Sequence, residues 1–176
     1  MNFLILLALA IVFAVVALTR TRIKVSQFSG ENWDDLVARL EPVPFNGLSI
    51  VALDYLQPTK GQIAIETNQI WELVGGSEGL RRMSTNAEVL IALAGYAQQW
   101  NRQEGIIVVE RMRRDGAALR RATRKLSLGL LLGYGGASGP FNVQEAASAY
   151  YLMRQRLLAL YETSHAGRYP RLAAAL

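Results

Sequence analysis

The chain has 176 residues, no cysteine, one histidine and a formal net charge of +5. The absence of cysteine excludes disulfides, thiolate metal sites and a cysteine nucleophile, and a single histidine is too few for a histidine-based metal site. Beyond the apolar N-terminal run described next, about 150 residues remain, which is the size of one ordinary domain.

Every side chain from residue 3 to residue 18 is apolar. A helix of about 18 residues is roughly 27 Å long, near the hydrocarbon thickness of a bilayer. A cleavable signal peptide carries positive charge before its apolar run, whereas here the bases follow it, and a core helix that is apolar on every face is rare in a short chain. The sequence therefore predicts an uncleaved transmembrane anchor over residues 1–19. Its lipid-facing residues would include Phe3, Leu4, Ile11, Phe13 and Leu18.

The bases after this run predict its orientation. Arg20, Arg22 and Lys24 lie in a juxtamembrane linker over residues 20–28. Positive residues that flank a span stay on the cytoplasmic side of the membrane. We therefore expect a single-pass protein of the cell (inner) membrane with its N-terminus outside. A cytoplasmic helical domain would follow over residues 29–163, and a polar, flexible tail over residues 164–176.

The charge of the remaining chain is unevenly distributed. Residues 25–110 hold 11 acidic and 5 basic side chains, whereas residues 111–176 hold 11 basic and 3 acidic side chains. The two halves could neutralise each other across the folded domain. Alternatively, the basic half could face anionic lipid or an acidic partner.

Apolar residues recur at helical spacing through the first half of the chain. Three short helices are expected: one after an N-cap at Ser29, one after a cap at Asn46, and one from Gly61 to Gly75. Residues 48–53 could also form a buried strand, but no partner strand is evident. The expected core positions are Trp33, Leu36, Val37, Leu40, Leu48, Val51, Ala52, Tyr55, Leu56, Ile63, Ile70, Trp71 and Val74.

Longer helices are expected in the second half. Thr85 and Glu88 have the spacing of a capping box and predict one helix start, and Asn142 and Glu145 predict another, with Phe141 as a hydrophobic staple. Between them, beyond a polar break over 101–105, the longest helix should run from about residue 106 to beyond residue 126. The expected core positions are Val89, Leu90, Leu93, Ala97, Trp100, Val109, Met112, Gly116, Leu119, Thr123, Leu126, Val143, Ala147, Tyr150, Tyr151, Leu157, Leu158 and Tyr161. The predicted fold class is all-α: a transmembrane helix followed by a bundle-like domain.

The stretch 111–125 is the strongest candidate for a binding surface. It holds seven bases and one acid, Asp115, and most of the bases fall opposite the apolar stripe of the same helix. Each base near a membrane adds about 1 kcal/mol of attraction to anionic lipid. Nucleic acid phosphates would also attract these bases, but no aromatic side chain lies among them to stack on nucleotides, so nucleic acid is not the expected partner. The candidate residues for an anionic surface are Arg113, Arg114, Arg120, Arg121, Arg124 and Lys125.

Residues 126–134 are mostly apolar and follow this basic stretch directly. Nine residues are too few to span a bilayer. They either complete the core of the bundle or carry an apolar tip to the membrane surface. The sequence leaves both interpretations open.

Motifs that would indicate catalysis are missing. No Gly-x-Ser-x-Gly elbow or Gly-Lys-Ser/Thr phosphate loop occurs, and carboxylates such as Asp34, Asp35, Glu66 and Glu72 are placed as helix caps or solvated residues. We therefore expect no catalytic residue, metal or cofactor. The prediction is a non-enzymatic accessory subunit or scaffold whose helical domain binds another protein in a membrane complex. The alternative is an anchored module that binds anionic lipid or nucleic acid through residues 111–125.

Overall fold

The computed structural model describes residues 32–58, 65–131, 139–164 and 167–176. The predicted anchor over 1–19 and the basic linker over 20–28 lie outside these residues. So do the predicted cap at Ser29, the predicted helix start at Gly61 and the histidine, His165. Within the described ranges, no helix combines the length and the apolar character needed to cross a membrane.

All secondary structure in these ranges is helical, which confirms the predicted all-α class. Residues 48–53 are helical, so the alternative of a buried strand is wrong there. The helices are α2 (Trp33–Ala38), α3 (Phe45–Leu56), α4 (Thr67–Leu73), α5 (Gly76–Ala97), α6 (Arg102–Leu131), α7 (Gly139–Ser164) and α8 (Tyr169–Ala175).

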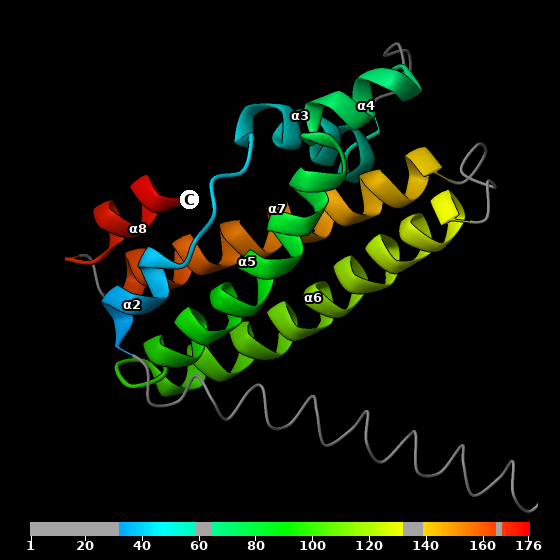
Figure 1. Ribbon diagram of the computed structural model, residues 1–176. Coiled ribbons are helices and arrows are strands. Elements are labelled where there is room, and N and C mark those ends of the chain that lie inside the picture. Colours follow the sequence, from blue (N-terminus) through cyan, green and yellow to red (C-terminus); the bar gives the residue numbers. More distant parts are fainter. Residues whose placement is uncertain (1–31, 59–64, 132–138, 165–166) are drawn as a thin grey trace, which may run out of the picture. The chain divides into compact units, whose positions relative to one another are not determined.

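The three longest helices, α5, α6 and α7, pack against one another as a bundle. Figure 1 shows α6 and α7 side by side along their lengths, while α5 crosses them. The short helices cover this bundle: α3 and α4 pack on α7, α2 packs on α5, and α8 packs on the C-terminal part of α7. The bundle therefore leaves one side of α6 without a helix of the described chain against it.

Large apolar side chains at helical spacing fill the bundle. Trp33, Leu36, Leu48, Met83, Leu90, Leu93, Met112, Leu119, Tyr150, Met153, Leu157 and Tyr161 are almost fully buried. All but two of these were expected from the periodicity of the sequence; Met83 and Met153 are the additions. Leu56 and Trp100 are exceptions in the other direction, because they are 37% and 38% exposed although both were assigned to the core.

The predicted helix starts at Thr85 and Asn46 are wrong. Thr85 lies in the middle of α5, where its hydroxyl donates to the Arg81 carbonyl at 3.2 Å. Such a back-bond inside a helix satisfies the hydroxyl without a cap, so the capping-box spacing alone was misleading. Asn46 likewise lies inside α3, which begins one residue earlier. The turn before α5 is set instead by Gly75, whose φ of 79° favours glycine.

A side-chain cap does occur at the start of α6. The Glu104 backbone N–H donates to Asn101 Oδ1 at 3.3 Å, and Asn101 Nδ2 donates to Glu104 Oε2 at 2.8 Å. Asn101 therefore caps the helix that the sequence placed about four residues later. The predicted polar break is accordingly shorter than expected.

The start of α7 also differs from the prediction. The helix begins at Gly139, so Asn142 is a buried residue inside it rather than its cap. Phe141 is 54% exposed and does not act as a staple. Its ring instead meets the ring of Tyr55 of α3 edge to face, with the ring centroids 5.6 Å apart.

The C-terminal residues differ from the polar, flexible tail expected over 164–176. Tyr169–Ala175 form α8, a short helix that begins with Pro170 in its first turn, a position that proline favours. Leu172 is fully buried against the rest of the domain. Arg171 Nη1 lies 2.6 Å from Asp34 Oδ1 of α2 and ties the two ends of the domain's chain together.

Candidate functional site

We define the α6 cationic face as the six residues singled out above: Arg113, Arg114, Arg120, Arg121, Arg124 and Lys125. The structure places all six on the exposed side of α6. On the opposite side, Met112 and Leu119 are fully buried and Leu126 is 7% exposed. This division follows from helical periodicity, because the apolar residues recur every seven positions and the bases fall between them.

Three members of the α6 cationic face have acidic neighbours. Arg113 and Arg114 lie 4.0 and 3.4 Å from Glu110 of the same helix, and Arg120 lies 3.9 Å from Glu88 of α5. These pairs are well exposed, so each contributes between zero and about 1 kcal/mol to stability. Within the described residues, Arg120 is therefore the one member that meets an acid of another helix.

The remaining three, Arg121, Arg124 and Lys125, form no ion pair or side-chain hydrogen bond with any described residue. They lie on one stripe of the helix because their spacing is three and four residues. Leu128 continues this stripe one turn later and is 51% exposed. Leu126, by contrast, is buried in the core. Of the two interpretations of residues 126–134, Leu126 therefore fits completion of the core, and Leu128 fits an apolar side chain exposed at the surface. Residues 132–134 lie outside the described ranges.

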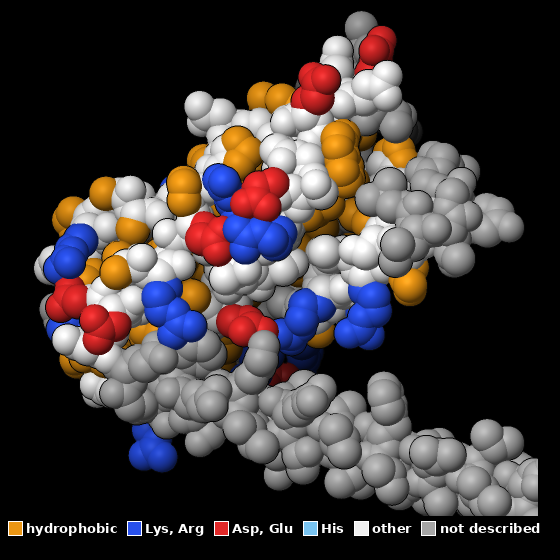
Figure 2. Space-filling model, in the orientation of Figure 1, with side chains coloured by type: hydrophobic (Ala, Val, Ile, Leu, Met, Phe, Trp, Pro, Cys, Tyr) orange, Lys and Arg blue, Asp and Glu red, His pale blue; other side chains and the backbone are white. Residues whose placement is uncertain are grey.

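Asp115, the single acid of the basic stretch, does not face outward with the bases. Its carboxylate pairs with the Arg156 guanidinium of α7, and these side chains are only 18% and 29% exposed. Burial lowers the pKa of Arg156, and the nearby positive charge of Arg111 lowers it further. Between residues 111 and 125 the outer side of α6 therefore carries bases and no acid of its own, and the acids paired with it are Glu110 and Glu88. Figure 2 shows Lys and Arg side chains over α6 on one face of the molecule.

A second cluster of charges, at the start of α5, is self-neutralised. Arg81 lies 2.6 Å from Glu41 and 2.9 Å from Glu78, and Arg82 lies 3.0 Å from Glu78. Hydrogen bonds from Arg81 and then Arg82 lower the pKa of Glu78 to about 2. Arg82 also donates to the Pro42 carbonyl at 3.0 Å. The cluster fastens the segment before α3 to α5 and leaves no carboxylate free for proton transfer.

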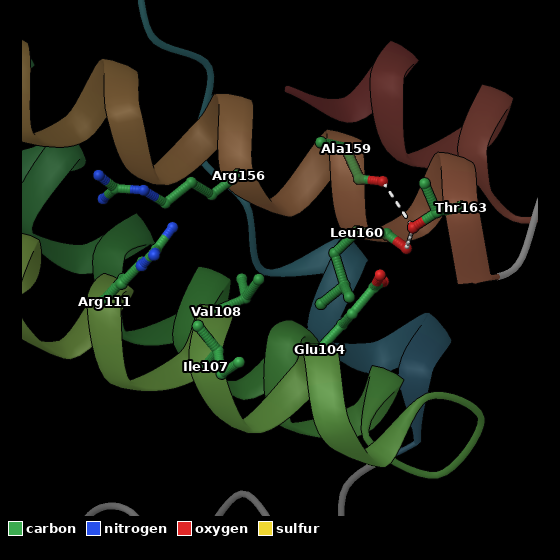
Figure 3. A pocket seen from close by; sticks show the side chains of 8 residues that line it. All are labelled: Glu104, Ile107, Val108, Arg111, Arg156, Ala159, Leu160 and Thr163. Atoms are coloured by element: carbon green, nitrogen blue, oxygen red, sulfur yellow. Dashed lines mark hydrogen bonds between the residues drawn. The ribbon is translucent and has the colours of Figure 1, made fainter.

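A shallow cleft of about 310 Å³ lies between α6 and α7, with a mostly apolar lining. Figure 3 shows Arg111 and Arg156 at one end and Glu104 and Thr163 at the other. The Thr163 hydroxyl donates to the Ala159 carbonyl at 3.1 Å, and Glu104 is already bound by the cap of α6. The lining residues are Glu104, Ile107, Val108, Arg111, Arg156, Ala159, Leu160 and Thr163. This set offers no second carboxylate to pair with Glu104 for acid–base chemistry.

The carboxylates considered for catalysis are dispersed. Asp34, Asp35, Glu66 and Glu72 are all exposed, and Asp34 pairs with Arg171. Across the described ranges, no group of three histidine, aspartate or glutamate side chains is placed to hold a metal ion.

Sequence reasoning missed a cluster of aromatic rings around Arg168. The rings, Trp33, Tyr96 and Trp100, come from α2 and from α5 and the turn after it, and Arg168 comes from the segment before α8. No local spacing pattern links such distant positions; the one available indication was that two of the rings, Tyr96 and Trp100, occur near the end of α5. No family model matches the chain, and neither the curated proteins nor the solved structures contain a significant match to it.

Proposed function

We propose that this chain is a non-enzymatic binding protein, held at the cell membrane by residues 1–19, whose helical domain docks on anionic lipid through the α6 cationic face. The observation that carries the proposal is the exposed stripe of Arg121, Arg124 and Lys125, which forms no ion pair with a described residue. Bases presented in this way keep their full attraction for an external anion. The cytoplasmic leaflet is the nearest extended anionic surface for a domain on a short tether behind such an anchor.

Two features favour lipid over nucleic acid. No aromatic side chain occurs anywhere in α6, so the face lacks the rings that stack on nucleotides. Leu128 adds an exposed apolar side chain to the end of the basic stripe. A basic helix face with an apolar side chain at its edge is typical of segments that lie at a membrane interface.

The test compares two variants of equal net charge in a fragment that begins at Ser29. The first, Arg121→Gln/Arg124→Gln/Lys125→Gln, removes three positive charges from the α6 cationic face. The control, Gln69→Glu/Gln99→Glu/Gln155→Glu, adds three negative charges at exposed positions outside α6. At about 1 kcal/mol per base, the first variant should lose on the order of a hundredfold in affinity for vesicles rich in phosphatidylglycerol. The control should lose much less.

Sedimentation with vesicles at low and high salt supplies the readout. Binding of the unmodified fragment should weaken at high salt, because ions screen exposed charges. Equal losses in the two variants would mean that net charge alone acts, and would contradict a defined docking face. Tighter binding to duplex DNA than to the vesicles would favour the nucleic acid alternative instead.

A second candidate function, binding to a protein partner in a membrane complex, is favoured by a different surface. Ile50 and Leu53 of α3 are 53% and 40% exposed, and Phe141 at the adjoining start of α7 is 54% exposed. Exposed large apolar side chains that gather on neighbouring helices often mark protein interfaces. A tagged pull-down from native membranes in mild detergent tests this function. A partner that survives high salt but is lost in Ile50→Glu/Leu53→Glu would support it, and retention of the same partner by that variant would argue against it.

A further inference from the structure

The guanidinium of Arg168 lies among three aromatic rings. Its Cζ atom is 5.0 Å from the ring centroid of Trp33, 5.3 Å from that of Tyr96 and 5.1 Å from that of Trp100. All three distances fall within the range of about 6 Å in which a cation is attracted to the face of an aromatic ring. We call these three rings the aromatic cage.

Contacts other than those with Arg168 hold the cage in place. Trp33 Nε1 donates to the Tyr161 hydroxyl at 3.0 Å, and this hydroxyl donates to the Leu93 carbonyl at 2.8 Å. Tyr161 is fully buried, and Trp33 is 2% exposed. The rings of Tyr96 and Trp100 meet edge to face, with their centroids 5.3 Å apart. The cage is therefore built into the bundle, and it should persist when Arg168 leaves.

The cage holds its cation without a carboxylate. Arg168 forms no ion pair with a described residue, and its Nη1 atom is buried without a hydrogen-bond partner. Asp34, on the same helix as Trp33, is paired with Arg171 at 2.6 Å. A guanidinium usually satisfies its donors with carboxylates, so attraction to the rings is what holds Arg168 here. A site of this kind favours weakly hydrated cations that do not need hydrogen bonds.

The segment that delivers Arg168 is attached to the domain by few contacts. Arg168 immediately precedes α8, a seven-residue helix whose one buried side chain is Leu172. The other attachments are the exposed Arg171–Asp34 ion pair, the contact of the Arg171 guanidinium with the Trp33 ring at 5.5 Å, and a 3.3 Å hydrogen bond from Arg154 Nε to the Leu176 carbonyl. Elements with few buried contacts open at low free-energy cost. The cage can therefore exchange its occupant without unfolding of the bundle.

We propose that the aromatic cage is a binding site for a weakly hydrated organic cation, either a methylated ammonium or the guanidinium of an arginine side chain, and that Arg168 occupies it from within the chain. The external cation and α8 then compete for the same site. Ligand binding releases α8 from Trp33, and the apparent affinity falls in proportion to the time that Arg168 spends in the cage. This inference stands apart from the lipid-docking proposal, because the cage and the α6 cationic face share no residue.

The test uses the full chain in a non-ionic detergent and follows tryptophan fluorescence. Tetramethylammonium and ethylguanidinium chloride are titrated separately, with potassium chloride at equal ionic strength as the reference. Arg168→Ala, which empties the cage, should bind the organic cations at least tenfold more tightly than the unmodified chain. Asp34→Asn, which breaks the clasp of α8 but keeps all three rings, should give an intermediate gain. Arg168→Ala/Trp100→Ala should lose binding, and because Trp100 is 38% exposed, the domain should stay folded.

The two probes also distinguish the source of the cation. Tighter binding of tetramethylammonium identifies a methylated ammonium ligand, and tighter binding of ethylguanidinium identifies an arginine side chain; either result supports the site. The proposal is overturned if folded Arg168→Ala shows no saturable response to either probe beyond that to potassium. Equal affinities of Arg168→Ala and the unmodified chain would overturn the competition with α8.

Discussion

Asn86 should be the polar residue on which the stability of this domain depends most. It lies on α5 with 1% of its surface exposed. Its Oδ1 accepts from the Glu41 backbone N–H at 2.9 Å, and its Nδ2 donates to the Glu41 carbonyl at 2.7 Å and to the Tyr150 hydroxyl at 3.1 Å. The Asn86 amide thus satisfies the backbone N–H and C=O of Glu41, which lies in a segment without secondary structure, and ties this segment to α5 and α7.

Asn86→Ala removes all three hydrogen bonds and leaves their partners without replacements. Each such bond contributes about 1 kcal/mol net, and the buried Tyr150 hydroxyl loses a donor that it cannot replace from water. We therefore expect the free energy of unfolding to fall by about 3 kcal/mol, a large part of the 5–15 kcal/mol typical of a domain.

Urea denaturation measured on the Ser29 fragment checks this value. The matched control is Thr85→Ala at the neighbouring, exposed position, whose hydroxyl makes one bond inside the helix. That substitution should change the free energy of unfolding by less than about 0.5 kcal/mol. A loss for Asn86→Ala no larger than that of the control would refute the account of this network.

Three further predictions concern charges and close packing. Glu78 should titrate near pH 2 in a carboxyl NMR experiment; because its pKa is lowered, its ion pairs stabilise the fold above the ordinary value of 4.5 and are lost as the pH falls toward 2. A midpoint near 4.5 at low salt would contradict this. Gly79→Ala should cost about 3 kcal/mol, because its new methyl group would collide with the carbonyl at the end of α4, whereas Gly95→Ala, with open space around it, should stabilise α5 by up to about 1 kcal/mol. If the two variants shift the melting temperature in opposite directions, this packing is supported, and shifts in the same direction would contradict it. Asp115→Asn should cost about 1–2 kcal/mol, less than the 3–5 kcal/mol of a fully buried pair, because Arg156 loses its counter-charge in a half-buried site; an unchanged melting temperature would exclude this role.

Periodicity made much of this fold predictable. The seven-residue recurrence of Met112, Leu119 and Leu126 marked the buried side of α6 correctly, and the same pattern placed the candidate bases on its exposed side. Helix starts were less predictable, because a hydroxyl such as that of Thr85 can satisfy itself inside a helix. The spacing of a capping box is therefore not sufficient to predict a helix start.

Long-range contacts could not be predicted from the sequence. Trp33 and Tyr161 are 128 residues apart yet joined by a hydrogen bond, and Arg168 reaches both Trp33 and Tyr96. The C-terminal segment was predicted to be a tail because its few apolar residues do not form a long stripe. In the structure, one buried leucine, one ion pair and the aromatic rings are enough to dock it.

The most direct test of lipid docking is to measure whether Leu128 enters the membrane interface. The chain has no cysteine, so Leu128→Cys provides a unique site for a nitroxide label, and Gln69→Cys on α4 provides the control. With vesicles rich in phosphatidylglycerol, the label at 128 should gain accessibility to oxygen and lose accessibility to an aqueous nickel complex, while the label at 69 should not change. Vesicles of phosphatidylcholine alone should produce neither effect. Unchanged accessibility at position 128, or equal changes at both positions, would contradict docking through the α6 cationic face.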